Sequence, residues 1–186
     1  MKISLPHNII GLQLKSARSN KSWSLDTASK HTGVSKAMLG QIERGESSPT
    51  VSKLWEIANG FELPLTYFFG ELATNNTLPE KLITEQSIAI ATLFPFDPKT
   101  KSEIFLLTLE PLHQHMSVPH NTGVIEHLIV IEGEMEYYIN NQWHHLKQGE
   151  FVKFNADVEH GYRNLSDKKT TFHNMIFYTG EEKQPT

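Results

Sequence analysis

Between residues 8 and 69 the apolar positions recur every three or four residues. Ile10, Leu14 and Ala17, for example, share one side of the chain if this stretch is helical. Three later apolar runs each begin directly after a side chain that can cap a helix, namely Ser24, Ser35 and Thr50. Gly60 stands just past the expected end of the last run, and one further helical turn follows it. The pattern predicts about five short helices.

From about residue 82 the pattern becomes strand-like and rich in β-branched and aromatic residues. The candidate strands are "SIAIATLF", "EIFLLTL", "VIEHLIVI", "MEYYIN", "EFVKF" and "TTFHNMIFY". Many short strands in so few residues predict an antiparallel sandwich or a small barrel. The segment between the two patterns loses periodicity and fills with Thr, Asn and Pro, as a linker does. We therefore expect an α+β protein with a helical domain over 1–70, a linker over 71–81 and a β domain over 82–186.

Composition narrows the function classes. The 186 residues are 38% hydrophobic and 20% charged, which is typical of a globular chain. The absence of Cys excludes disulfides, iron–sulfur clusters and thiol catalysis, so a metal would need His, Asp or Glu ligands. No apolar run approaches the roughly 18 residues of a membrane span, and the start "MKISLPHNII" does not read as a secretory signal. We expect a cytoplasmic protein without membrane contact.

Charge divides the chain in the same place as the periodicity. Residues 1–70 hold eight Lys or Arg against five Asp or Glu, a formal charge of +3. Residues 71–186 hold nine against sixteen, a charge of −7, together with eight of the ten His residues. The mild positive charge permits contact with a polyanion but does not establish it, so a nucleic-acid partner must be argued from a motif.

The stretch "SLDTASKHTGVSKAMLGQIERGESSPT" predicts two short helices joined by a turn at Gly33. In the second helix Leu39 and Ile42 face the core, whereas Lys36, Gln41 and Arg44 lie on the outer side. Glutamine can hydrogen-bond to an adenine edge, and Lys or Arg can contact guanine or phosphate. The periodicity alone leaves a second interpretation open, in which this is the solvated face of an ordinary helical bundle.

The same stretch, with "LWEIANGFELPLTYFF", resembles the five-helix DNA-binding domain of XRE-family (lambda/434 repressor-like) helix-turn-helix regulators. The resemblance implies that four residues face the DNA groove, namely Ser35, Lys36, Ala37 and Gln41, and that Arg44 lies near the DNA backbone. It also implies an ion pair between Arg18 and Glu43 that braces the first helix against the recognition helix. Leu25 departs from the family, which often has a phosphate-clamping Gln there.

The β region contains candidate ligand side chains at strand spacing. In "PHNTGVIEH" an extended chain would place His120, Thr122 and Glu126 on one face and His127 on the other. Further along, the side chains of His160, Tyr162 and Asn164 share a face. Imidazole and carboxylate groups are ligands for divalent transition metals. The remaining His residues, expected to be exposed or hydrogen-bonded rather than ligands, are His113, His115, His144, His145 and His173.

These stretches resemble the two sequence motifs of the cupin superfamily, whose members are small antiparallel β-barrels of the jelly-roll type. The matching positions are His120, Glu126 and Gly133 in the first motif and Gly149, His160 and Asn164 in the second. Thr122 stands where the family has a second metal-binding His. The resemblance implies a divalent metal (Zn, Fe, Ni or Mn) on His120, Glu126 and His160. Because a hydroxyl replaces an imidazole, we favour a small-molecule pocket formed by His120, Thr122, Glu126, His160, Tyr162 and Asn164.

A helix-turn-helix domain followed by a cupin domain is similar to a class of bacterial transcription regulators. The resemblance implies a homodimer that binds a double-stranded DNA operator and responds to a small-molecule effector. Within this class, "SKAMLGQIER", "ESSPT" and "GVIEH" are similar to regulators linked to sulfur utilisation. The main alternative is a metal-dependent cupin enzyme, a dioxygenase or isomerase, fused to a DNA-binding domain. A third interpretation is a DNA-binding protein with an inert barrel.

Overall fold

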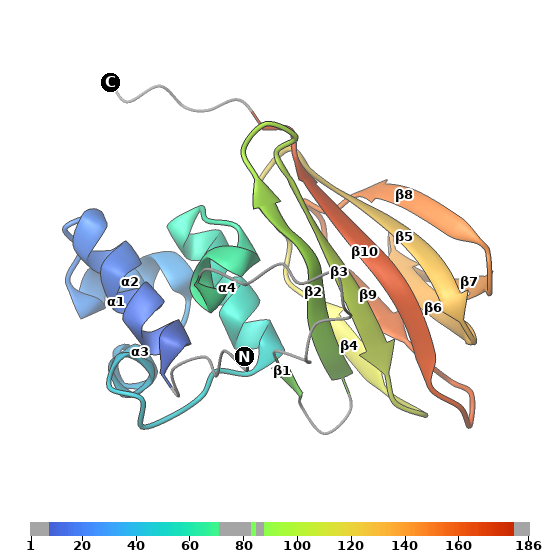
Figure 1. Ribbon diagram of the computed structural model, residues 1–186, viewed down its shortest axis with the longest axis horizontal. Helices are drawn as coiled ribbons and strands as arrows, with labels where there is room; N and C mark the ends of the chain where they lie inside the picture. The colour runs from blue at the N-terminus through green and yellow to red at the C-terminus, as the bar shows by residue number, and fades with distance from the viewer. Residues whose placement is uncertain (1–7, 71–82, 85–87, 181–186) are drawn as a thin grey trace, which may run out of the picture. The chain divides into compact units, whose positions relative to one another are not determined.

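The computed structural model describes residues 8–70, 83–84 and 88–180 (Figure 1). The chain divides into two compact units, Met1–Asn76 and Thr77–Thr186, and each unit is described by itself. The first unit is helical and the second is built of β-strands, which confirms an α+β chain of two parts. The predicted linker at 71–81 lies outside the described residues. No helix among the described residues is long and apolar enough to span a membrane.

Within residues 8–70, the part of the helical unit that the structure describes, there are four α-helices and one short 3-10 helix. Their bounds are α1 Ile9–Asn20, α2 Leu25–Thr32, α3 Lys36–Glu43, α4 Val51–Phe61 and η1 Leu65–Phe69. All three predicted caps are confirmed, because the hydroxyls of Ser24, Ser35 and Thr50 accept backbone N–H bonds from the first turns of α2, α3 and α4. The expectation of five α-helices is wrong, since the last element is a single 3-10 turn that follows Pro64.

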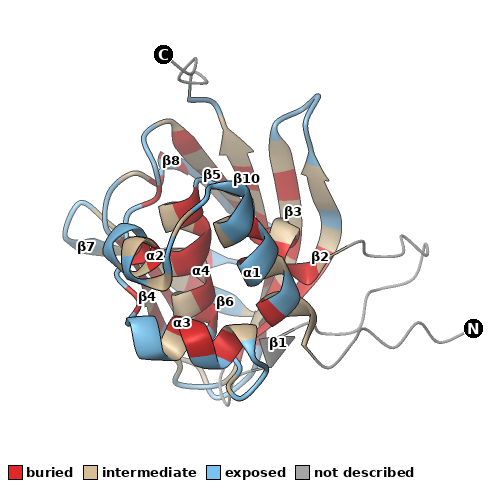
Figure 2. Ribbon diagram, turned by 90° about the vertical axis from the view of Figure 1, so that its left-hand side faces the viewer, coloured by how far each residue is buried: buried red, intermediate tan, exposed pale blue. Residues whose placement is uncertain are grey.

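The core of this unit forms around α4, whose buried side is visible in Figure 2. Leu54, Ile57 and Phe61 have no exposed surface. Gly60 does not end the helix as expected, because α4 continues through Phe61 and ends at Glu62 in the left-handed conformation. A Cβ atom at Gly60 would lie 2.6 Å from the Cα of Thr32. The glycine therefore allows α2 and α4 to pack closely.

The predicted ion pair in the helical unit is confirmed. Nε of Arg18 on α1 lies 2.6 Å from one carboxylate oxygen of Glu43, and Nη2 lies 2.8 Å from the other. Nη1 of the same guanidinium donates to the backbone oxygen of Trp23 at 2.9 Å. The side chains are only 19% and 8% exposed. This bidentate contact fixes α3 against α1, and so fixes how α3 is presented to solvent.

The described residues of the β unit form ten strands. They are β1 Ile83–Thr84, β2 Ile88–Asp97, β3 Ser102–Leu109, β4 Gln114–Ser117, β5 Val124–Glu132, β6 Glu134–Ile139, β7 Gln142–Lys147, β8 Phe151–Asn155, β9 His160–Arg163 and β10 Thr170–Tyr178. One sheet has the order β1-β2-β3-β10-β5-β8, and the other has the order β4-β9-β6-β7. Every pairing between described strands is antiparallel, as predicted.

The predicted closed barrel is wrong in one respect, because the described strands form two separate sheets rather than one continuous ring. The chain passes between the sheets through turns that interrupt the hydrogen-bond ladder. At Gly133, between β5 and β6, φ is +81° and an added Cβ would lie 2.8 Å from the hydroxyl of Thr170. The result is a two-layer sandwich in which alternate residues of each strand face the interior.

Strand register determines which residues lie together in this interior. On the six-stranded sheet, Glu126 of β5 pairs with Ile176 of β10, which also pairs with Glu103 of β3. On the four-stranded sheet, His115 of β4 pairs with Tyr162 of β9. The buried positions on both sheets alternate with less buried ones, so each sheet has one inner and one outer face. The inner faces carry the polar groups described below.

Candidate functional site

The helix α3 presents the predicted DNA-contacting residues to solvent. Ser35, Lys36, Ala37, Gln41 and Arg44 are all exposed. By contrast, Leu39 and Ile42 on the opposite side of the helix are completely buried. The hydroxyl of Ser35 accepts a hydrogen bond from the backbone N–H of Met38 at 3.2 Å, so this side chain caps the helix. The arrangement leaves small, amide and cationic groups available at one surface, as contact with a DNA groove requires.

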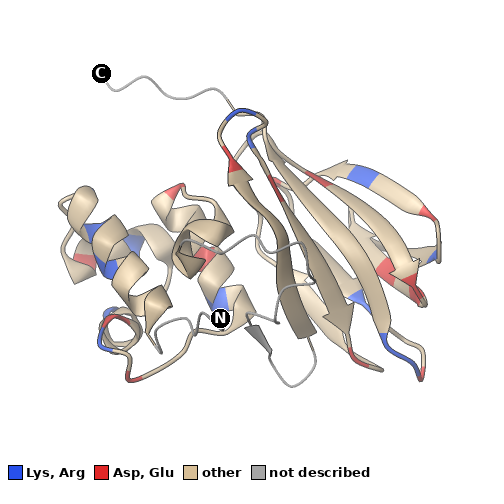
Figure 3. Ribbon diagram, viewed as in Figure 1, with Lys and Arg blue, Asp and Glu red and all other residues tan. Residues whose placement is uncertain are grey.

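Both cations of this surface are paired with carboxylates. Nζ of Lys36 lies 2.8 Å from a carboxylate oxygen of Asp26 in the first turn of α2. Arg44 makes a two-point contact with Glu46, with Nε to Oε1 at 2.7 Å and Nη2 to Oε2 at 2.6 Å. All four side chains are more than half exposed. Figure 3 shows that Lys, Arg, Asp and Glu residues are interspersed over the helices. The reading surface is therefore locally neutral rather than strongly basic.

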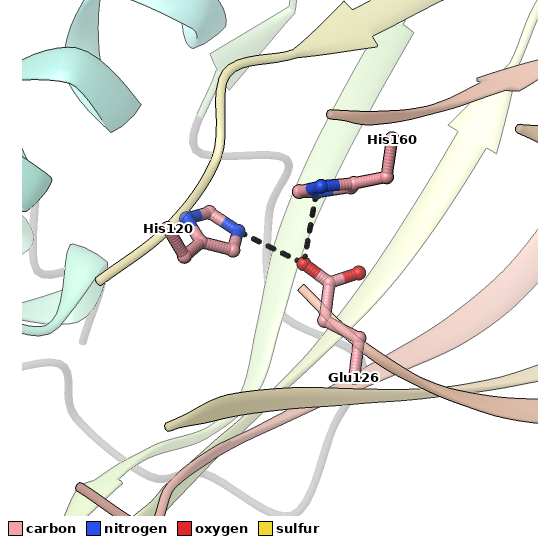
Figure 4. Close-up of side chains that lie close together, drawn as sticks. All are labelled: His120, Glu126 and His160. Atoms are coloured by element: carbon pink, nitrogen blue, oxygen red, sulfur yellow. Dashed lines mark hydrogen bonds and ion pairs between the residues drawn. The ribbon is translucent and has the colours of Figure 1, made fainter. Parts of the chain in front are cut away.

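In the β unit a carboxylate stands between two imidazoles, deep between the sheets. Nε2 of His120 lies 2.9 Å from Oε1 of Glu126. Nε2 of His160 lies 3.4 Å from the same oxygen, an ionic contact without hydrogen-bond geometry. Figure 4 shows both rings directed at this oxygen. The three side chains are at most 3% exposed. Residues from three separate segments are thus brought together around one buried charge.

The other carboxylate oxygen of Glu126 also has partners. The hydroxyl of Tyr162, on the opposite sheet, donates to Oε2 of Glu126. Nδ2 of Asn174 on β10 donates to the same oxygen at 3.1 Å and also contacts the Tyr162 hydroxyl at 3.3 Å. Because an ionised carboxylate only accepts hydrogen bonds, these contacts fix the orientation of the Asn174 amide. Its Oδ1 is buried and has no hydrogen-bond partner among the described residues.

Electrostatics keep Glu126 ionised. Burial alone would raise the pKa of its carboxyl, but His160 and His120 outweigh burial and hold that pKa below its usual range. For His160 burial acts in the other direction and lowers the pKa, but the Glu126 carboxylate outweighs burial and raises this pKa above its ordinary value. Burial and the same carboxylate hold the pKa of Tyr162 well above 10.0, so its hydroxyl keeps its proton. The cluster is an ionised carboxylate surrounded by groups able to donate hydrogen bonds.

The three residues implied by the cupin motifs fit a divalent metal ion. Their ligand atoms all lie within 4.8 Å of one another, compatible with metal bonds of about 2.0–2.2 Å. Nδ1 of His160 lies 2.8 Å from the backbone oxygen of Val158, which can only accept a hydrogen bond. Nδ1 therefore carries the proton, and in the neutral ring Nε2 keeps its lone pair, as a metal ligand must. Bound there, an ion would supply Lewis acidity and hold a donor atom of a ligand.

Two predicted pocket residues lie outside this cluster. Thr122 is exposed in the turn before β5, so the alternation that would have placed it beside Glu126 begins only at Val124. Asn164 is fully buried, but its amide donates to the backbone oxygens of Leu109, Glu110 and Lys168 and holds the turn after β9. The structure thus brings together His120, Glu126, His160 and Tyr162 and leaves these two residues apart.

The inner position of His115 was not anticipated, and neither was that of Asn174 described above. His115 was expected to be exposed or hydrogen-bonded rather than a ligand, and of these the exposed position is wrong, because His115 is 8% exposed and shares the inner face of β4 and β9 with Tyr162. Burial, with smaller contributions from His113 and His160, lowers the pKa of His115 to about 4. Its ring is therefore neutral near pH 7. The sequence "QHMS" gives no signal for this inner position, because its one apolar residue, Met116, is less buried than His115 and Ser117, and four residues are too few to identify a strand.

Known proteins match both parts of the chain. The family description "Helix-turn-helix" matches residues 14–68, and "Cupin domain" matches residues 105–176. Over 167 residues the chain is 42% identical to the HTH-type transcriptional regulator SutR of Escherichia coli (strain K12), covering 89% of this chain and 92% of that one. The chain belongs to the XRE family of helix-turn-helix regulators with a cupin domain. The family membership expected from the helix-turn-helix and cupin motifs is confirmed. The chain, called the regulator below, is a DNA-binding transcription regulator.

Solved structures agree with this assignment. The regulator superposes on an HTH_3 family transcriptional regulator from Vibrio cholerae with a TM-score of 0.84 and 44% identity, covering 94% of this chain and 97% of that chain. The Cupin_2 domain of an XRE family transcriptional regulator from Enterobacter cloacae is 39% identical, with a TM-score of 0.50, and covers 51% of the regulator and all of that domain. Both units of the regulator thus have solved relatives within the class.

Proposed function

We propose that the regulator is a cytoplasmic, ligand-responsive transcription factor without enzymatic activity, whose cupin unit binds a small-molecule effector at His120, Glu126, His160 and Tyr162. The buried cluster around Glu126 carries this proposal. Taking a carboxylate and two imidazoles out of water costs free energy, and similarly sized apolar residues often make a core as stable or more stable. Groups of this kind therefore concentrate at binding sites. The ionised carboxylate and its imidazole and hydroxyl neighbours can bind a polar ligand directly or through a metal ion.

The DNA part of the proposal rests on α3. Ser35, Lys36, Ala37 and Gln41 contact the groove, with Arg44 at the phosphate backbone. A single small head makes few phosphate contacts, so we infer a homodimer that places two heads on half-sites about 34 Å apart or a multiple of that distance. Effector and operator are then coupled by linkage, because an effector that favours one arrangement of the dimer changes its affinity for DNA.

The test uses the full chain purified from cells without chelator. Native mass spectrometry is expected to detect a bound small molecule or divalent ion that is lost in His160→Ala. The matched control is His173→Ala, which removes an imidazole from the outer face of the same unit. Operator affinity, measured on DNA selected from a random pool, should differ between loaded and stripped protein. Equal occupancy in the two variants and the unchanged protein would contradict the assignment of the site.

The enzyme alternative is favoured by one observation, the two-His, one-carboxylate group with metal-compatible spacing. It requires that a bound metal leave positions open for a substrate and that turnover depend on that metal. Turnover of a candidate substrate by metal-loaded protein, abolished in Glu126→Gln, would replace the sensor proposal. We propose binding without turnover.

A role in sulfur utilisation is the most specific part of the proposal. Its support is the resemblance of "SKAMLGQIER", "ESSPT" and "GVIEH" to regulators linked to sulfur utilisation, beside the 42% identity to the transcriptional regulator SutR. Deleting the gene should change transcripts selectively when inorganic sulfate is withdrawn, compared with withdrawal of ammonium. An equal response to both limitations would remove sulfur from the proposal and leave the DNA-binding assignment intact.

A further inference from the structure

Two buried asparagines of the β unit, Asn164 and Asn174, differ in their hydrogen bonding. Oδ1 of Asn164 accepts two hydrogen bonds from Ser166, one from its backbone N–H at 2.9 Å and one from its hydroxyl at 2.8 Å. Asn174 also donates hydrogen bonds through Nδ2, but its Oδ1 is buried and has no hydrogen-bond partner among the described residues. Buried polar atoms of folded proteins nearly always have a partner. The oxygen of Asn174 is therefore an exception that requires a physical reason.

The orientation of the Asn174 amide is fixed by its polar neighbours. Nδ2 lies 3.1 Å from Oε2 of Glu126 and 3.3 Å from the hydroxyl of Tyr162, which itself donates to that carboxylate oxygen. An amide nitrogen carries two donors, one for each of these contacts. Turning the amide over would place Oδ1 against Oε2, and two acceptors would then face each other without a proton between them. Oδ1 therefore has to find its donor away from Glu126.

The sheet around Asn174 provides no side-chain donor. Its cross-strand partners are Phe105 of β3 and Leu128 of β5, and its neighbours on the same face of β10 are Phe172 and Ile176. All four side chains are buried hydrocarbon groups without a hydrogen-bond donor. A donor for Oδ1 therefore has to come from the space between the two sheets, where the polar cluster lies.

We propose that Asn174 is a specificity-determining residue of the effector site, and that its Oδ1 accepts a hydrogen bond from an O–H or N–H group of the effector. This rests on the proposed function, because it takes the cluster around Glu126 as the effector site. The amide that carries Oδ1 contacts Glu126 directly, so a molecule held at the cluster lies within reach of the oxygen. A hydroxyl, an amine or an amide N–H satisfies this acceptor, whereas an ether or a fully substituted amide leaves it unpaired. Sites with a buried polar group discriminate against ligands that lack its partner.

The first experiment titrates matched pairs of probes into the isotope-labelled full chain, observed by NMR after a chelator has removed any bound ion. Propylene glycol and its dimethyl ether test an O–H donor, and acetamide and N,N-dimethylacetamide test an N–H donor. At least one donor probe is expected to bind about tenfold more tightly than its methylated counterpart, because only the donor pairs the buried oxygen. It should also shift the side-chain amide signals of Asn174. The amide signals of Asn164, whose oxygen already has two donors, should not move.

Two results would overturn the role of Asn174. One is equal binding of the two members of both pairs. The other is that neither donor probe shifts the Asn174 amide signals at any concentration at which the protein stays folded, because Oδ1 would then be closed to ligands or served by water.

A variant attributes the preference to the oxygen itself. Asn174→Leu replaces the amide with an apolar side chain of similar size, and the preference for the donor probe should fall from about tenfold to none. The matched control is Thr92→Val, which removes another buried oxygen without a hydrogen-bond partner among the described residues, on β2, two strands away from β10. The control should keep the preference. A preference that survives Asn174→Leu would overturn the proposal, and if this variant fails to fold, the amide signals of the unchanged protein decide.

His160→Ala separates a failure of this inference from a failure of the proposed function. Donor-selective binding that both Asn174→Leu and His160→Ala weaken would support both. Binding that is equal within each pair and lost in His160→Ala would reject the role of Asn174 and leave the effector site in place. Probe binding that His160→Ala leaves unchanged would reject the site around Glu126, and with it the proposed function.

Discussion

The helical unit exposes its functional polar residues, whereas the β unit buries them. Among the described residues of the helical unit, the buried polar side chains are Thr32 and Thr66, and the DNA-reading residues are exposed. In the β unit, ten of the described polar residues are buried, including Glu103 and Glu126. Function in the first unit can therefore be changed at little cost in stability. In the second unit a change to the cluster alters the core itself, so stability and ligand response are coupled.

The strongest test of this contrast removes the carboxylate at the centre of the β unit. Glu126→Ala leaves the donors of His120, Tyr162 and Asn174 without their shared acceptor. We expect the free energy of unfolding of the β unit to fall by about 3–5 kcal/mol, measured by urea denaturation. The comparison is Glu136→Ala, which breaks the contact with Arg163 on the outer side of the other sheet and should cost about 0–1 kcal/mol. Similar losses for the two variants would contradict a special role for the buried carboxylate.

A second test uses pH and the buried imidazole of His115. Its folded pKa of about 4 lies below its unfolded value near 6.5, so the unfolded chain takes up a proton first as pH falls. We expect the β unit to lose about 2 kcal/mol of stability between pH 6.5 and pH 5. His160 has a raised pKa, so its stabilisation is complete below 6.5 and is lost only as pH rises through its folded pKa. Glu126, whose pKa is lowered, loses its contribution only below about 4.5.

His115→Gln isolates this titration. Glutamine keeps a polar side chain on the inner face but carries no charge at any pH in this range. The groups that face His115 are His113, His160, Glu126 and Tyr162, which is the cross-strand partner of His115. All of them remain in the variant. The loss between pH 6.5 and pH 5 should therefore largely disappear, even if the variant is less stable throughout. An unchanged pH dependence would assign the acid sensitivity to another group.

Local sequence signals predicted the helical unit well and the β unit in part. Ser24, Ser35 and Thr50 each accept a hydrogen bond from the backbone N–H three residues later, so their capping roles were visible in the sequence. The six runs rich in β-branched and aromatic residues likewise predicted β2, β3, β5, β6, β8 and β10, whereas β7 was not among them although it is as long as β6. Short strands such as β4 and β9 were not predicted either, because four residues carry too little periodicity and their pairing depends on distant segments. The separation into two sheets depends on turns such as that at Gly133.

The same distinction between local and long-range signals explains which residues of the candidate site were predicted and which were missed. His120, Glu126 and His160 were predicted because family motifs mark them, and the structure brings them together. Thr122 was expected beside them because an extended chain was assumed, whereas a turn occupies residues 122–123 and points it to solvent. Asn174 was missed because its role depends on β10 lying between β3 and β5, a long-range arrangement that its own sequence context does not encode.

In the helical unit, a change at the reading surface should affect binding without affecting the fold. Gln41 is exposed, so Gln41→Ala removes a base-reading amide but no core contact. We expect operator affinity to fall by about 10- to 100-fold, equivalent to about 1–3 kcal/mol, in fluorescence anisotropy with selected operator DNA. Binding to random-sequence duplex should hardly change. The free energy of unfolding should remain within about 0.5 kcal/mol of the unchanged protein. A large loss of stability would show that Gln41 also supports the core.

The smallest expected effect concerns the carboxylates that pair with the reading cations. Asp26 holds Nζ of Lys36 at 2.8 Å, so DNA binding must exchange this contact for a phosphate or a base. Asp26→Asn removes both the competing partner and a negative charge near the DNA backbone. We expect affinity for any duplex to rise about fivefold, which is the size of one surface charge interaction at short range. This gain in affinity should shrink as salt is added, because salt screens the interaction. Anisotropy titrations at several salt concentrations measure both quantities.

The matched control for Asp26 is Glu62→Gln. Glu62 lies 3.8 Å from Lys21 and follows α4, so the change removes the same charge from the helical unit at a position outside α2 and α3. It should alter DNA affinity less than Asp26→Asn does. In a Lys36→Gln background the benefit of Asp26→Asn should shrink, because no cation remains to be released. If the two neutralised variants bound DNA equally well, the unit would respond only to its total charge, and the contrast between an exposed, residue-specific reading surface and a buried sensor core would be lost.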